Sequence, residues 1–223
     1  MCGRFAVDKK PEEIAEEVQA EWDDNTWNMP SWNVCPTSYS PVLSEGLLHS
    51  WTWGLIPSWS RDDKRRAALI NARIETIVEK PSFRNLVGRK QCIIPCDGYY
   101  EWLREGKQKI PYYLKRHAGM LLLAGLWDVW KDGTGTEIHS FTVITKEADE
   151  SIAHIHNRMP VILELEEAKK WSQNSLSKDD ALDVSLNELS FHQVSQKVNS
   201  VRNNSRDLME PVKNPQMRQQ DLF

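Results

Sequence analysis

The residues of this sequence that are best suited to covalent chemistry stand at its start, in Met1-Cys2-Gly3-Arg4. A cysteine at position 2 is small enough for Met1 to be removed, which leaves a free α-amine and a thiol on one residue. Such a 1,2-aminothiol captures an aldehyde, because the amine condenses to an imine and the sulfur then closes a five-membered thiazolidine. The reference pKa of an α-amine, about 7.7–8.0, leaves part of it neutral near pH 7. The thiol, at about 8.5, needs a nearby cation or base, and Arg4 is the nearest cation in the sequence.

A cysteine at this position also has a purely structural interpretation. Small buried cysteines are common in protein cores. Taken alone, Cys2 favours that interpretation, so the rest of the chain must decide between packing and chemistry.

Length and composition narrow the class of protein. The 223 residues suit one domain with a substantial core. No run of about 18 apolar residues and no basic-then-apolar leader is found, so we expect a cytoplasmic protein without a membrane partner. Four cysteines without a Cys-x-x-Cys pair suggest reduced thiols and no zinc. A net charge of −4 argues against indiscriminate coating of nucleic acid, but it permits a local basic groove.

Hydrophobic periodicity predicts many strands and few helices. Apolar spacing at Ile14, Val18 and Trp22 predicts a helix over residues 8–22, with Asp8 as its cap. A second helix is expected over 164–172, and residues 173–190 are expected to be connective. Predicted strands, which include a meander of antiparallel hairpins, cover 32–37, 47–53, 69–76, 91–96, 99–102, 110–116, 120–130, 138–145, 161–163 and 191–198.

Two of these strands carry polar residues that could act on a substrate. In an extended strand, Asn71, Arg73 and Glu75 share one face, although Arg73 and Glu75 could instead form a buried ion pair. Glu101 lies between aromatic residues, where burial would raise its pKa and suit it to proton transfer. The alternative is a carboxylate bonded to a tyrosine hydroxyl or to an arginine.

Two further segments leave functional and structural interpretations open. In His154-Ile155-His156, no acidic or cysteine partner stands at ligand spacing, so we expect no metal. His156, which is followed by Arg158 and a Met-Pro step, is the better general acid or base. Trp59 precedes a cationic stretch over 61–66, which is either a solvated surface or a grip on single-stranded nucleic acid.

Together these segments resemble the SOS-response-associated peptidase (SRAP) family of abasic-site processing proteins. The resemblance runs in family order over roughly residues 1–212. The matching motifs are Met1-Cys2-Gly3-Arg4-Phe5, Trp32-Asn33-Val34-x-Pro36, Trp53-Gly54-Leu55-Ile56-Pro57-x-Trp59, Ile70-Asn71-Ala72-Arg73-x-Glu75-Thr76, Cys96-Asp97-Gly98-Tyr99-Tyr100-Glu101-Trp102, His156-x-Arg158-Met159-Pro160, and Val194-Ser195 to Val198-Asn199.

The resemblance implies an α+β fold with curved, largely antiparallel sheets, a barrel-like core and a few flanking helices. It implies one domain over 1–212, followed by a polar tail over 213–223. The implied partner is single-stranded DNA containing an abasic site, held in a positively charged channel and crosslinked to Cys2 as a thiazolidine. No cofactor is implied. We expect a monomer that associates with the nucleoid when it acts on DNA.

The resemblance also assigns roles by matched position. Glu101 would open the sugar ring and transfer protons, His156 would shuttle a proton on the sugar hydroxyl, and Asn71 would orient Cys2 and the sugar. Residues expected to contact DNA are Arg4, Arg73, Arg158, Trp59, Pro36, Asn33, Lys80 and Arg84. The sequence departs from the family pattern around Pro81, where either Lys80 or Arg84 could contact phosphate, and at Cys35, a second thiol near the start.

Three functions remain as alternatives at this stage. The first is an enzyme that forms a DNA–protein crosslink, with strand-cleaving lyase activity through the imine and removal of its own Met1. The second is a thiol peptidase that uses Cys2 as an N-terminal nucleophile and its α-amine as the base. The third is a non-catalytic reader of damaged or single-stranded DNA.

Overall fold

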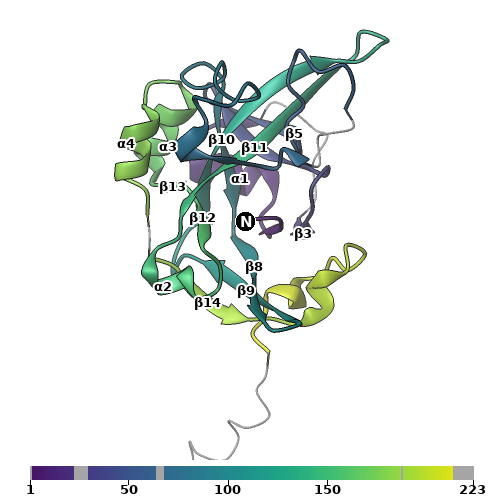
Figure 1. Ribbon diagram of the computed structural model, residues 1–223, viewed down its shortest axis with the longest axis vertical. Coiled ribbons are helices and arrows are strands. Elements are labelled where there is room, and N and C mark those ends of the chain that lie inside the picture. Colours follow the sequence, from purple (N-terminus) through teal and green to yellow (C-terminus); the bar gives the residue numbers. More distant parts are fainter. Residues whose placement is uncertain (1, 23–29, 64–67, 187, 213–223) are drawn as a thin grey trace, which may run out of the picture.

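The computed structural model describes residues 2–22, 30–63, 68–186 and 188–212. More of these residues lie in strands than in helices (Figure 1). The strands are β1 (Phe5–Val7), β2 (Glu21–Trp22), β3 (Ser31–Val34), β4 (Tyr39–Ser44), β5 (Leu47–Trp53), β6 (Asn71–Arg73), β7 (Gln91–Cys96), β8 (Gly98–Glu105), β9 (Gln108–Lys115), β10 (Leu121–Lys131), β11 (Glu137–Glu147), β12 (Arg158–Pro160), β13 (Ile162–Leu163) and β14 (Ser190–Gln193). The α-helices are α1 (Pro11–Val18), α2 (Glu150–Ala153), α3 (Leu165–Ser172) and α4 (Lys178–Asp183), and the 3-10 helices are η2 (Ile74–Thr76), η3 (Gln196–Asn199) and η4 (Arg206–Met209).

A closed ring of five strands forms the core of the larger, nine-stranded sheet. Strand β7 lies between β4 and β10, β10 pairs with β11, and β4 pairs with β5. The ring closes where β11 pairs in parallel with β5, at Ser140↔Thr52 and Phe141↔Trp53. Closure removes sheet edges that would otherwise expose unpaired backbone groups. The predicted α+β fold with curved, largely antiparallel sheets and a barrel-like core is confirmed.

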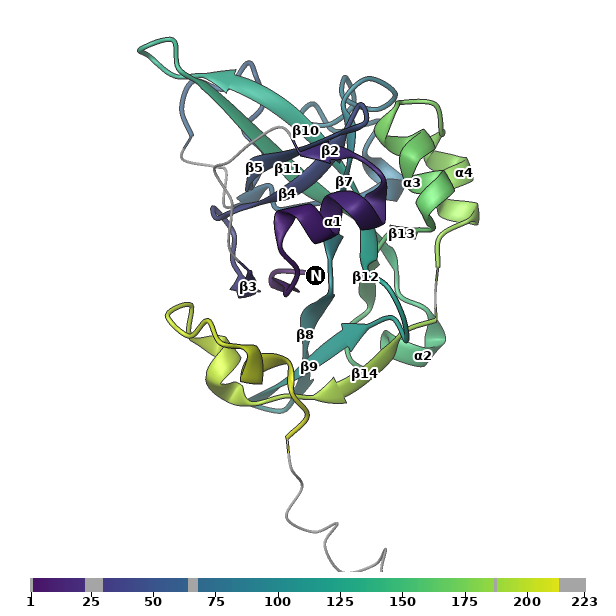
Figure 2. The same ribbon diagram turned by 180° about the vertical axis from the view of Figure 1, so that it is seen from behind.

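The second sheet has the strand order β14-β9-β8-β1-β3 and lies below the barrel in the views of Figures 1 and 2. Its strand β1 pairs on one side with β3 and on the other with β8, so that Phe5 lies opposite both Val34 and Tyr99. The beginning of the described chain therefore lies where the two sheets meet, as Figure 2 shows beside the label N.

Two tryptophans fix the framework around this junction. Trp53 and Trp171 are the largest of the fully buried side chains. The indole of Trp171 donates to the backbone oxygen of Gly125 (3.1 Å), which attaches α3 to β10. The indole of Trp53 donates to the backbone oxygen of Ile70 (3.0 Å), which fixes the residue that precedes β6. Each buried indole thus satisfies its polar N–H while it packs in the core.

The predicted helix over 8–22 is too long at both ends. Helix α1 begins at Pro11, where the Glu13 carboxylate accepts from the Lys10 backbone N–H (2.7 Å). It ends at Val18, because Gln19 adopts the left-handed conformation (φ 55°). Asp8 does not cap the helix, since one of its carboxylate oxygens accepts from the Trp32 indole N–H (2.7 Å).

Three further predictions are corrected by the structure. The strand predicted over 69–76 is β6 followed by η2, so Glu75 does not share a strand face with Asn71 and Arg73. The strand predicted over 191–198 ends at Gln193 and is followed by η3. The stretch expected to be connective contains α4, whose first turn is capped by the Ser177 hydroxyl, which accepts from the Asp180 N–H (3.1 Å).

Within the described residues, no helix has the length and apolar character needed to cross a membrane. The expected polar tail, 213–223, lies outside the described residues, and the domain boundary at 212 remains a prediction.

Substitution Gly98→Ala tests how tightly β8 packs against β9. A Cβ atom at Gly98 would lie 2.5 Å from Cζ of Tyr113 and 2.6 Å from the backbone oxygen of Leu114, so the pair must separate. We expect the free energy of unfolding to fall by about 1–3 kcal/mol, as for other overpacked sites. Gly133→Ala is the matched control, because no atom lies within 4 Å of its added carbon. Equal unfolding midpoints for the two variants in urea would contradict this packing.

Candidate active site

A pocket of about 550 Å³ lies at the junction of the two sheets, and segments far apart in the sequence form it. Its lining residues are Arg4, Glu101, Trp102, Arg104, Lys109, His156 and Asn199. The pairing of β1 with β8 explains the position of the pocket. The Tyr100 backbone N–H donates to the Arg4 oxygen (2.9 Å), and in the described chain β1 does not pair with β8 beyond this point. The edge of β8 after Tyr100 therefore borders the pocket.

Cys2 is held next to this pocket by an asparagine. The Asn71 side-chain amide donates to the Cys2 backbone oxygen (2.8 Å), and the Cys2 side chain is fully buried. Asn71 is itself fixed because β6 pairs in parallel with β11, with Asn71 opposite Val143. The structure thus brings together Cys2 and Asn71, two of the four residues predicted to act in catalysis.

The Cys2 thiol is kept protonated by its surroundings. Burial raises the pKa of the thiol well above its ordinary value, and the negative charge of nearby Glu101 raises it further. The guanidinium that was expected to assist this thiol points elsewhere. Nη1 of Arg4 donates to Oδ1 of Asn33 (2.7 Å) and to the Val198 oxygen (2.8 Å). The thiol nearest to the Arg4 charge is Cys35, whose pKa is raised by burial, an effect that the Arg4 charge partly offsets.

Glu101 is a buried acid on the wall of the pocket. Its side chain is 3% exposed, and burial raises the pKa of its carboxyl above the ordinary value. The predicted direction of this shift is confirmed. Tyr99 is also fully buried, and burial raises the pKa of its hydroxyl, as does the proximity of Cys2 and Glu101. A protonated carboxyl in this position can donate a proton and take it back.

His156 lines the pocket with a defined tautomer. Its Nδ1 accepts from the Arg158 backbone N–H (3.0 Å), so the neutral ring carries its proton on Nε2. Burial lowers the pKa of this half-buried imidazole, and the positive charges of Arg104 and Arg158 lower it further. His156 is therefore a neutral hydrogen-bond donor near pH 7. By contrast, His154 packs against Phe191 (ring centroids 5.4 Å apart) and does not line the pocket.

The predicted ion pair of Arg73 with Glu75 is replaced by a different one. The two guanidinium nitrogens of Arg158 donate to the two Glu75 oxygens (2.8 and 2.9 Å), and one of them also donates to the Thr145 oxygen (2.7 Å). This bidentate pair joins the loop that carries His156 to η2. The Arg158 guanidinium is therefore engaged by Glu75 and Thr145, and it holds the wall of the site in place. Its predicted contact with phosphate remains a prediction.

Asn33 connects the start of the chain with the C-terminal loop. Besides accepting from Arg4, its side-chain amide donates to the backbone oxygens of Ser200 (3.1 Å) and Asn203 (2.6 Å). Its side chain is 5% exposed. In the described chain, Asn33 is thus a buried support for the pocket wall, and its predicted contact with DNA is untested.

Six other residues predicted to bind DNA do not line this pocket: Arg73, Arg158, Trp59, Pro36, Lys80 and Arg84. Trp59 is 64% exposed and borders a separate pocket of about 580 Å³ together with Pro57 and Leu69. Arg73, Lys80 and Arg84 are exposed, and Pro36 is half-buried. Residues 64–67 of the adjoining cationic stretch lie outside the described residues.

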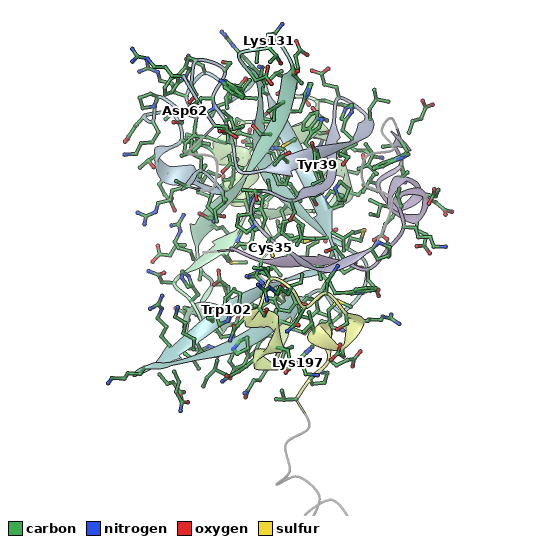
Figure 3. The ribbon with its side chains drawn as sticks, turned by 90° about the vertical axis from the view of Figure 1, so that its right-hand side faces the viewer. Cys35, Tyr39, Asp62, Trp102, Lys131 and Lys197 are labelled. Carbon is green, nitrogen blue, oxygen red and sulfur yellow. The ribbon has the colours of Figure 1, made fainter. Side chains whose placement is uncertain are left out.

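Two cations of the pocket, Arg104 and Lys109, were not predicted from the sequence. The signal was present, because a hairpin that turns at Gly106 places the two residues opposite each other. Trp102 and Asn199 lie in two of the motifs that carry the family resemblance, but the sequence assigned neither residue a role. In the structure, the Trp102 indole donates to Oδ1 of Asn199 (2.7 Å). Trp102 and Cys35 lie on the same face of the molecule (Figure 3).

No group of three or more His, Cys, Asp or Glu side chains in the described part of the chain is placed to hold a metal ion. All four cysteines are free.

Comparisons with known proteins agree on one family. The model of the family described as SOS response associated peptidase (SRAP) matches residues 1–201. The abasic site processing protein YoqW of Bacillus subtilis is 37% identical, over 94% of this chain and 99% of that protein. The abasic site processing protein HMCES of Xenopus tropicalis is 32% identical, over 95% of this chain and 78% of that protein.

The fold is also similar to solved structures. The crystal structure of a protein from Bacteroides thetaiotaomicron matches with a TM-score of 0.86 and 28% identity, over 95% of this chain and 100% of that one.

Substitution Glu101→Gln tests the buried acid through the pH dependence of stability. Because the folded state holds the Glu101 proton more tightly than the unfolded state, stability present below the ordinary pKa of the carboxyl is lost as pH rises through the raised value. A glutamine side chain cannot ionise, so we expect the variant to melt above the wild type at pH 7.5 and the difference to shrink near pH 4. Glu105→Gln, on the exposed end of β8, is the control. A gain independent of pH, or a loss at pH 7.5, would exclude a raised pKa.

Proposed function

Because the chain belongs to the SOS response associated peptidase family, we propose that it processes abasic sites in single-stranded DNA by forming a covalent bond through Cys2. Two relatives that match most of this chain are named abasic site processing proteins. The observation that carries the proposal is the position of Cys2, which Asn71 holds beside the acid Glu101. The pocket next to them also contains His156 and three cations.

The reaction begins when the sugar ring opens. As the C1′–O4′ bond of the abasic deoxyribose breaks, O4′ gains a proton and the C1′ hydroxyl loses one, which gives the aldehyde. Glu101 supplies the first proton from its protonated form, which burial favours by raising the pKa of the carboxyl. His156 donates a hydrogen bond from Nε2 to the sugar oxygen. Because Nδ1 is occupied by the Arg158 N–H, this donor role fits better than the expected proton shuttle.

Capture of the aldehyde then follows in two steps. Removal of Met1 by hydrolysis frees the Cys2 amine, which adds to C1′ and releases one water as the imine forms. The thiol next adds across the C1′=N bond, so that sulfur bonds to C1′ and the thiol proton ends on nitrogen. Glu101 lies close enough to the thiol to raise its pKa, and it can carry that proton. A protonated thiol does not compete with the amine for the aldehyde, which sets the order of the steps.

The imine also allows strand cleavage. It acidifies the C2′ protons, and loss of one of them expels the 3′ phosphate by β-elimination. Ring closure by the thiol removes the imine, so the thiazolidine protects the strand while lyase activity remains a slower branch. Removal of Met1 is the peptidase activity that this chemistry requires. The pocket favours a nucleic-acid backbone over a peptide, because Arg4, Arg104 and Lys109 line it and phosphates are the anions that such cations bind.

Intact-mass spectrometry tests the proposal before and after incubation with a single-stranded oligonucleotide that carries one abasic site. We expect the wild type to lack Met1 and to gain a stable adduct of the oligonucleotide mass minus one water. Cys2→Ala should give no adduct. Cys2→Ser keeps the amine but loses the thiol, so its adduct should persist only after borohydride reduction.

Cys35→Ala is the matched control, because Cys35 is also a free thiol and lies near Arg4. This variant should react like the wild type. Retention of Met1 with no adduct, or an adduct that survives in Cys2→Ala, would overturn the proposed chemistry. Binding without any adduct would instead identify a reader of damaged DNA, and turnover of unrelated peptides that depends on Cys2 would identify a thiol peptidase.

A further inference from the structure

Two positive charges face each other across the β8–β9 hairpin. Arg104 of β8 lies directly opposite Lys109 of β9, and both side chains are exposed. Like charges in this arrangement destabilise a strand pair. Among the described residues, neither cation forms an ion pair with a carboxylate that could offset the repulsion. The pair therefore costs stability in the free protein, and an anion bound between the two side chains would recover it.

The pair lies in the pocket that contains the reactive groups. Arg104 and Lys109 line it together with Glu101 and His156, and the Arg104 charge is close enough to lower the pKa of His156. The hairpin extends beyond Trp102 at the lower left of Figure 3. Its base is anchored because the Trp102 indole donates to Asn199 (2.7 Å). The two cations thus project from a fixed strand pair beside the proposed site of reaction.

The chemistry of the pair suits one phosphodiester group. Opposite residues of an antiparallel pair have Cβ atoms about 4.5–5.5 Å apart, so both long side chains can reach the same anion. An arginine fork binds two phosphate oxygens, while a lysine adds a point charge. We propose that Arg104 and Lys109 bind the backbone phosphate next to the abasic nucleotide and so position the sugar against Glu101 and His156. This rests on the proposed function, because that function places an abasic nucleotide in the pocket.

Binding to an intact single-stranded oligonucleotide tests the pair separately from the covalent chemistry. Fluorescence anisotropy over a range of salt concentrations gives the slope of log K against log salt, which is about −0.7 for each neutralised phosphate on a single strand. For Arg104→Gln/Lys109→Gln we expect the slope to become shallower by about 0.7 and affinity at low salt to fall by about tenfold. The conservative Arg104→Lys/Lys109→Arg should keep the slope of the wild type.

Arg116→Gln/Lys131→Gln is the matched control, because it removes the same net charge from outside the pocket. Arg116 pairs with Glu164, and Lys131 pairs with Glu137 on the β10–β11 hairpin. Its slope should equal that of the wild type. Thermal unfolding of Arg104→Gln/Lys109→Gln should occur at or above the wild-type temperature, since repulsion is removed; a lower temperature would contradict the strained pair.

The outcomes separate this proposal from the proposed function. The wild type could crosslink an abasic oligonucleotide while Arg104→Gln/Lys109→Gln keeps the wild-type salt slope. In that case Arg104 and Lys109 do not bind a phosphate, and the crosslinking function stands. A shallower slope in a protein that never crosslinks would support an Arg104–Lys109 phosphate site and overturn the abasic-site chemistry. An equally shallower slope in this variant and in its control would show only a dependence on net charge, and would contradict a phosphate site at Arg104 and Lys109.

Discussion

The hydrogen bond from the Asn71 amide to the Cys2 backbone oxygen fixes the beginning of the described chain to the barrel. Its strength as a positional constraint comes from what lies behind Asn71. Strand β6 pairs with β11, and the preceding Ile70 oxygen accepts from both the Val143 N–H (3.0 Å) and the buried Trp53 indole (3.0 Å). A chain terminus is ordinarily the least constrained part of a domain. Here the barrel holds it at the seam between the sheets, and the proposed capture of an aldehyde by Cys2 needs such fixed positions.

Burial shifts the pKa of each titratable group at this seam toward its neutral form. The Cys2 thiol and the Glu101 carboxyl both have raised pKa values because charge is disfavoured where water is excluded, and each charged form would repel the other. The pKa of His156 is lowered, which favours the neutral ring, and the contact at Nδ1 places the ring proton on Nε2. The site thus combines a buried thiol, a buried carboxyl and an imidazole at its wall with cations on one side. That combination suits a substrate whose sugar must exchange protons while its phosphates carry the charge.

The sequence predicted the features that depend on neighbouring residues and missed those that depend on distant ones. Alternation located β5, and the aromatic neighbours of Glu101 predicted the direction of its pKa shift. The pairing of Arg158 with Glu75 joins β12 to η2 across 83 positions of the sequence, so nothing local could reveal it. The support that Asn33 gives to the loop of Ser200 and Asn203 also depends on residues far away in the sequence. Helix α1 was extended wrongly because Trp22 continues its apolar period after Gln19 has ended the helix.

The central claim is that Asn71 presents Cys2 to a sugar lying between Glu101 and His156. A crystal structure of the protein after reaction with an abasic single strand tests it most directly. The account predicts electron density for a five-membered ring that contains N and Sγ of Cys2 and C1′ of the sugar, with the Asn71 bond to the Cys2 oxygen retained and the sugar oxygen within hydrogen-bond distance of Nε2 of His156. Density that joins the sugar to a lysine, or a Cys2 adduct directed away from Glu101 with the Asn71 bond broken, would contradict it.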